Sequence, residues 1–135
     1  MIFAHTLDKV IQGEKWQTRR LVKPGECFED NKRIIKNGRR MYEVGRSYAV
    51  QPNRGQKAVA RIRLKGLRKE TIDKITESDA RAEGFASVGD FLNTWHGIHG
   101  FHTDLSSEVW VFEFELISVT EEAVEGHHEG ANATN

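Results

Sequence analysis

An alternating aromatic segment near the end of the chain constrains the fold more than any other feature. Within 109–116, Trp110, Phe112, Phe114 and Leu116 alternate with Val111 and two glutamates. Successive side chains of a strand point to opposite faces, so this period of two predicts a strand with one large apolar face. The strand must therefore lie in a sheet that covers this face.

Helix-capping and helix-ending residues predict two short helices in the second half of the chain. Thr76 with Asp79 resembles a capping box, and Gly84 ends the helix that they begin. Ser87 begins the next helix. Trp95 falls on the apolar face of that helix, so we expect it in the core.

The remaining segments complete a mixed order of elements. A helix over 7–12 follows Thr6 and stops at Gly13, and further strands are expected at 1–4, 15–22, 47–51 and 58–64. This order predicts the α+β class: a small, mainly antiparallel β-barrel with flanking short helices.

Length and composition predict one domain, residues 1–118, followed by an acidic tail. Residues 23–46, rich in Lys, Arg, Gly and Asn, predict a basic loop insertion that could include one hairpin. Residues 119–135 predict a disordered segment. A single Cys27, no signal-peptide pattern and no run of ~18 apolar residues lead us to expect a cytoplasmic protein without membrane contact.

The net charge of zero conceals a strong asymmetry. Residues 15–70 carry 17 Lys and Arg against 5 Asp and Glu, whereas residues 71–135 carry 2 against 13. A basic half is typical of proteins that contact phosphates. The alternative is that the two halves attract each other within the fold.

Reactive side chains are concentrated directly after the first predicted helix. Lys15, Thr18, Arg19 and Arg20 place an amine, a hydroxyl and two guanidinium groups within six residues. An amine can activate a hydroxyl as a nucleophile if it is neutral. Neighbouring Arg charges and burial would lower the pKa of Lys15 and favour that state. The plainer alternative is a solvent-exposed strand edge.

Four segments in order resemble the ASCH domains, a branch of the PUA-like β-barrel superfamily. The first is Gly13-x-Lys15-x-x-x-x-Arg20. The others are the predicted strand Tyr48-Ala49-Val50-Gln51-Pro52, the helical Asp79-Ala80-Arg81-Ala82-Glu83-Gly84-Phe85 and the closing strand 109–116. The resemblance spans about residues 1–118 and implies the PUA-like barrel.

The resemblance also implies a function. One branch of small bacterial ASCH proteins removes the acetyl group of N4-acetylcytidine, and its Lys, Thr and Glu correspond to Lys15, Thr18 and Glu83. No cofactor is implied, and the expected partner is a modified nucleoside or RNA. Other ASCH proteins are described as RNA-binding modules or as a ribonuclease, so both functions stay as alternatives here.

Amide hydrolysis assigns a task to each of these residues. Thr18 would be the nucleophile, Lys15 the base and Glu83 the proton donor, while Arg20 could hold the oxyanion. Positions 15 and 18 of one regular strand face opposite ways, so we expect Lys15 at the bend before the strand. Glu77 competes with Glu83, but a helix start suits a structural Glu better.

Two further candidates, with weaker support, lie on the strand at 47–51. Gln51 could read a pyrimidine edge through its amide, and Tyr48 could stack on a base. Arg19, in the first motif, is a further expected substrate-binding residue. Both strand residues are equally explained by packing in the barrel. His96, His99 and His102 lack a further ligand at suitable spacing, so no metal site is predicted.

Overall fold

The main sheet has four strands in the order β1-β7-β6-β5, and every neighbouring pair is antiparallel. The computed structural model describes residues 1–101 and 103–120. His102 and residues 121–135, which include most of the tail that was predicted to be disordered, lie outside the described residues. The strands are β1 (Gln17–Leu21), β5 (Ser47–Val50), β6 (Ala60–Thr71) and β7 (Glu108–Val119).

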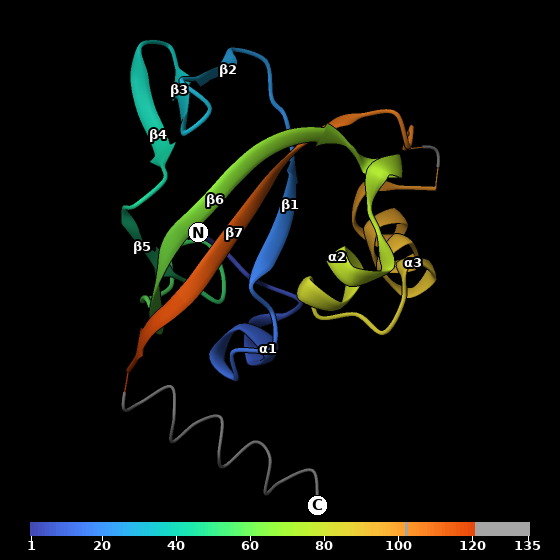
Figure 1. Cartoon of the computed structure of the whole chain (residues 1–135). Coiled ribbons are helices and arrows are strands. Elements are labelled where there is room, and N and C mark those ends of the chain that lie inside the picture. The colour runs from blue at the N-terminus through green and yellow to red at the C-terminus, as the bar shows by residue number, and fades with distance from the viewer. Residues whose placement is uncertain (102, 121–135) are drawn as a thin grey trace, which may run out of the picture.

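The two longest strands set the shape of the molecule. β6 and β7 pair from Ala60↔Val119 to Thr71↔Glu108 and arch together across it (Figure 1). Register shifts at Arg61/Ile62 and Leu64/Gly66 help to bend this ribbon, as β-bulges do. The sheet curls into a half-barrel, which confirms the predicted α+β class and its barrel-like sheet.

The expected loop at 23–46 is wrong, because this segment forms a second, three-stranded antiparallel sheet. Its strands are β2 (Glu26–Glu29), β3 (Arg33–Lys36) and β4 (Arg39–Glu43), here called the arm. Asn37 and Gly38 both have positive φ, 53° and 75°, as a two-residue hairpin turn requires. The Asn-Gly pair indicates such a turn in the sequence, but the prediction of a loop rested on the overall composition of the segment.

The arm is anchored to the half-barrel by apolar contacts. Ile34 is buried, and Phe28 and Tyr42 make edge-on ring contacts with Trp110 and Phe112 of β7. These aromatic residues belong to one core cluster with Leu64. The arm therefore contributes to the apolar interior beside β6 and β7.

Three helices flank the sheet: α1 (Leu7–Ile11), α2 (Glu77–Ala82) and α3 (Val88–His99), with a 3₁₀ turn η1 (Ile72–Lys74) before α2. The predicted capping box of α2 is confirmed, since Thr76 and Asp79 exchange both hydrogen bonds. Ser87 caps α3 as expected. The expected strand at 1–4 is reduced to one bridge between Ile2 and Gln51. None of the helices described is long and apolar enough to cross a membrane.

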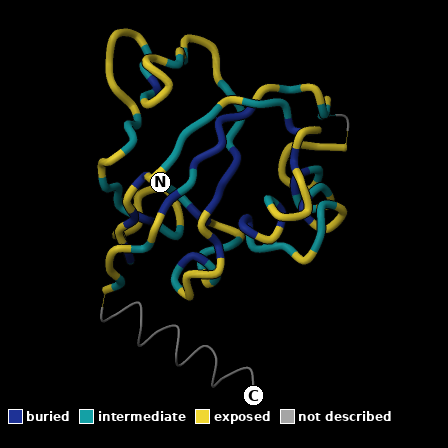
Figure 2. Tube along the Cα trace, viewed as in Figure 1, coloured by how far each residue is buried: buried dark blue, intermediate teal, exposed yellow. Residues whose placement is uncertain are grey.

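The buried residues lie on both sides of the sheet near β1 and β7. Inside the curl, Trp110, Phe112 and Phe114 of β7 pack on residues of β6, the arm and the N-terminal segment. On the other face, Val109 and Val111 pack on α3 and η1. Figure 2 shows this buried centre as the dark stretch along β1 and its neighbours, at the place where the candidate site lies.

Candidate active site

A cavity of about 250 Å³ lies where β1, the N-terminal segment and the last two helices meet. Three consecutive residues of β1, Thr18, Arg19 and Arg20, form one wall. Lys15 and Glu83 also line it. The structure thus brings five of the seven candidate residues to one cavity.

Lys15 lies at the bend before β1, as expected. Gly13 ends α1 with φ of 78°, and the chain then turns so that the Trp16 N–H donates to Ala82 O at the end of α2. The Lys15 Nζ is thereby directed at Glu83, donating to Oε1 at 2.7 Å and to the main-chain oxygen at 2.9 Å. Both side chains are almost fully buried, with exposures of 4% and 2%.

Arg19 is the second partner of Glu83. Its Nη1 lies 3.2 Å from Glu83 Oε2, and its Nη2 lies 2.6 Å from Glu70 Oε1 and 3.3 Å from Asp79 Oδ2. The Arg19 side chain has no exposed surface. Held by three carboxylates, it fixes the position of Glu83.

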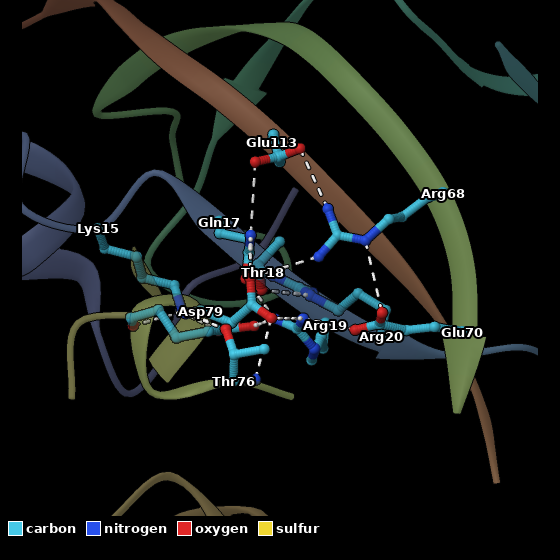
Figure 3. Close-up of polar contacts among 11 residues, drawn as sticks. Lys15, Gln17, Thr18, Arg19, Arg20, Arg68, Glu70, Thr76, Asp79 and Glu113 are labelled. Atoms are coloured by element: carbon cyan, nitrogen blue, oxygen red, sulfur yellow. Dashed lines mark hydrogen bonds and ion pairs between the residues drawn. The ribbon is translucent and has the colours of Figure 1, made fainter. Parts of the chain in front are cut away.

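The ion-pair network continues outward through Arg68, which contacts Glu70, Asp79 and Glu113 at 3.2–3.5 Å (Figure 3). Gln17 joins it by donating to Asp79 Oδ1 at 3.2 Å. These groups come from four elements, and no spacing in the sequence indicates that they meet.

The environment of the Lys15 amine lowers its pKa. Burial is the main cause that lowers the pKa of Lys15; the adjacent Glu83 opposes it, and the charges of Arg20 and Lys9 add to the lowering. Arg20, rather than the expected pair of Arg19 and Arg20, supplies the guanidinium contribution, because Arg19 is engaged by carboxylates.

Thr18 and Arg20 point into the curl of the sheet. The Thr18 Oγ1 accepts from Arg20 Nε at 3.3 Å, and Thr18 is 4% exposed. Arg20 also donates to Ile2 O at 2.7 Å and lies over the Phe3 ring. Within residues 1–101 and 103–120, the Thr18 hydroxyl has no acceptor for its own proton. It can therefore donate to a base or a substrate.

Tyr48 and Gln51 do not line the cavity. The Tyr48 hydroxyl accepts from the Glu43 N–H at 2.7 Å, and its ring packs on Tyr42 of the arm. The Gln51 Nε2 donates to Gln56 O at 3.0 Å, in the turn after β5. Both side chains are explained by local packing.

The aromatic wall of the cavity was not expected as part of a site. Phe85, Phe91, Trp95 and His99 line the side contributed by the α2–α3 connection and by α3. The helical spacing correctly predicts Trp95 in the core, where it is 4% exposed. The same side chain also faces the cavity region, a dual role that a periodic pattern cannot reveal. Among the described residues, no three His, Cys, Asp or Glu side chains are grouped as metal ligands.

No protein-family model and no curated protein matches the sequence. Among solved structures, an ASCH domain from Lactobacillus crispatus JV V101 superposes with a TM-score of 0.61 at 18% identity, covering 81% of this chain and 68% of that one. A protein of the DUF984 family from Enterococcus faecalis V583 superposes with a TM-score of 0.57 at 17% identity, covering 84% and 70%. The chain therefore has an ASCH-like fold, as the resemblance of its four motifs implies.

Proposed function

We propose that this protein is an amidohydrolase that removes the acyl group of an N4-acylated cytidine, such as N4-acetylcytidine. The observation that carries the proposal is the buried Lys15–Glu83 pair beside Thr18 in one cavity. A buried amine with a lowered pKa and a hydroxyl that is free to donate make a base and nucleophile suited to acyl transfer.

The reaction proceeds in two halves. Neutral Lys15 takes the proton of Thr18 as Oγ1 bonds to the acyl carbon. When the bond from carbon to N4 breaks, the proton passes across the 2.7 Å contact to Glu83 and on to N4, releasing cytidine. Water then attacks the acyl ester while Lys15 takes one of its protons. Lys15 returns this proton to Thr18 Oγ1 as the ester bond breaks, which yields the free acid and restores both residues.

The opposite wall suits a flat base. Phe85, Phe91 and Trp95 offer apolar ring surface, whereas the reacting groups are gathered on the β1 side. Such a division between an apolar wall and a few convergent polar groups is typical of small-molecule sites. A cavity of about 250 Å³ favours a single nucleoside unit as the reacting group.

The test is cytidine release from N4-acetylcytidine, followed by mass spectrometry. We expect turnover by the wild type and a loss of at least ~10³-fold in Thr18→Val, which removes the nucleophile and keeps the shape of the side chain. Thr71→Val, at the end of β6, should retain full activity. Equal turnover by Thr18→Val and the wild type would refute the Thr mechanism, and no turnover by the wild type would refute the substrate.

The alternative is an RNA-binding module without this activity, and one observation favours it. Arg61, Arg63 and Lys65 form an exposed basic row on the outward face of β6. Affinity for a single-stranded RNA would fall steeply with salt, because each phosphate contact releases counterions. Turnover of a neutral nucleoside should barely change between 50 and 200 mM salt, roughly the range over which phosphate contacts weaken strongly.

A further inference from the structure

The cavity lies along the open edge of the sheet. β1 pairs only with β7 and is therefore an edge strand. Side chains alternate between the two faces of a strand, so a cavity on one face is lined by every second side chain only. Thr18, Arg19 and Arg20 are consecutive, and all three line the cavity. The cavity must therefore run beside the strand edge and reach both faces.

The hydrogen-bond register determines which main-chain groups point into that space. The Phe114 N–H donates to Trp16 O, and the Val22 N–H donates to Glu108 O. Bonding alternates along an antiparallel strand, so the even-numbered residues of β1 bond to β7. The N–H and C=O of Arg19 consequently point away from β7, toward the cavity side.

These two Arg19 groups have no partner among the described residues. The Arg19 side chain has no exposed surface, so the 4% exposure of the residue lies on its main chain. Main-chain N–H and C=O groups are strong hydrogen-bonding groups. An N–H on this strand edge, directed away from β7, can therefore donate to a ligand in the cavity.

Arg19 is also held rigidly. Its guanidinium is fixed by Glu70, Asp79 and Glu83, and β1 is fixed by its pairing with β7. A donor held in place before the reaction stabilises developing charge without further reorganisation. The side-chain network therefore orients the peptide group between Thr18 and Arg19.

We propose that the main-chain N–H of Arg19 donates to the acyl oxygen of the substrate and stabilises the negative charge that forms on it. This inference rests on the proposed function and deepens it. As Thr18 Oγ1 bonds to the acyl carbon, the C=O electron pair moves onto the oxygen. The N–H that follows the nucleophile in the chain meets that oxygen at the strand edge.

Amide hydrogen exchange measured by NMR tests this role directly. Thr18→Val, which cannot turn over, is saturated with N4-acetylcytidine or with N4-ethylcytidine, which lacks the carbonyl oxygen. We expect N4-acetylcytidine to slow exchange of the Arg19 amide by about tenfold or more and N4-ethylcytidine to leave it unchanged. Gln17 and Leu21 are matched controls, because their amides also point outward but do not line the cavity.

The outcomes separate the two proposals. If N4-acetylcytidine perturbs the amides of Phe85 and Phe91 but leaves Arg19 exchanging freely, the inference is overturned and the proposed function stands. If both ligands protect Arg19 equally, the contact is not to the acyl oxygen and the inference is again overturned. If neither ligand perturbs any cavity residue, the proposed function itself fails.

A kinetic measurement isolates the same atom. Replacing the amide between Thr18 and Arg19 by an ester, through chemical ligation, removes this N–H and keeps every side chain. Because the N–H takes no part in the sheet, the fold should be retained. We expect kcat to fall by about 100-fold with KM nearly unchanged. The same replacement between Arg20 and Leu21 is the control, and equal kcat in both esters would refute the role.

Discussion

At the scale of single residues, the site is defined by how each buried charge is compensated. Lys15 has one carboxylate partner and several cationic neighbours, whereas Arg19 has three carboxylates. Two basic residues that lie only four positions apart therefore differ in environment. Burial lowers the pKa of Lys15, whereas Arg19 is held by three carboxylates.

Removing the charge of Lys9 should shift the pH dependence of turnover. Lys9 donates to Gly84 O, and its charge contributes to the lowered pKa of Lys15. Lys9→Gln keeps a donor but removes the charge, so the pKa of Lys15 rises. Because the proposed mechanism requires neutral Lys15, the rising limb of kcat/KM against pH should move to higher pH. The control is Lys57→Gln on the surface, and an unmoved limb in Lys9→Gln would contradict the assignment.

Removing Arg19 should destabilise the fold strongly. Arg19→Met leaves Glu70, Asp79 and Glu83 without their shared cation, and breaking a buried pair costs about 3–5 kcal/mol. The free energy of unfolding from urea denaturation measures this loss. Arg33→Met, which breaks pairs with Glu29, Asp30 and Glu43 in the arm, should cost much less, because water screens these charges. Equal costs would show that the Arg19 cluster is not a stabilising element.

At the scale of elements, β1 owes its functional potential to its position at the sheet edge. After the bend at Gly13, the Lys15 side chain contacts Glu83 at the end of α2. The alternation of side chains along β1 then directs Thr18 and Arg20 into the curl of the sheet. The arm follows β1 directly and packs on the β7 aromatics that lie behind the site. The segment that was predicted as a basic loop thus contributes to the folded core.

Two glycines, one in the hairpin turn of the arm and one in α3, should change the free energy of unfolding in opposite directions when they are replaced. Gly38 has φ of 75°, so Gly38→Val is strained and should lower the free energy of unfolding by about 1–2 kcal/mol. Gly97 lies within α3 with open space around it, so Gly97→Ala should raise the free energy by about 0.5–1 kcal/mol. Thermal denaturation measures both, and a destabilised Gly97→Ala would contradict the helical assignment.

Local patterns predicted the elements whose causes are local. The capping pair Thr76 and Asp79, the cap Ser87 and the alternation over 109–116 each act within a few residues, and all are confirmed. The arm escaped prediction because its strands are held by Ile34 against β7, about 75 residues away in the chain. The same holds for the network of Arg19, whose partners come from β6 and α2.

At the scale of the whole molecule, the two oppositely charged parts of the chain meet along β6 and β7. Lys69 pairs with Glu108, and Arg68 pairs with Glu113 across these strands. The attraction between halves that the sequence left open is therefore present in the fold. It coexists with exposed basic residues on β6, which leave the RNA alternative to experiment.

The arm and the half-barrel should unfold as one cooperative unit, because they share the core around Trp110. Ile34→Ala should lower the free energy of unfolding by about 2–5 kcal/mol, as is usual for a buried large-to-small change. Tryptophan fluorescence and far-UV circular dichroism should report a single coincident transition. Ile117→Ala, on a side chain that is 44% exposed, should change little. Two separate transitions would show that the arm folds independently.

The edge position of β1 has a consequence for how this protein can vary. A recognition group supplied by the main-chain N–H is present with every residue type except proline, provided that the strand keeps its course. In a complete mutational scan, position 19 would accordingly be intolerant because of its ion pairs. Such a scan of side chains would not detect the contribution of the main-chain N–H. Related sequences could exchange most of the cavity wall and so change what they accept, while inheriting the same receptor for a carbonyl oxygen.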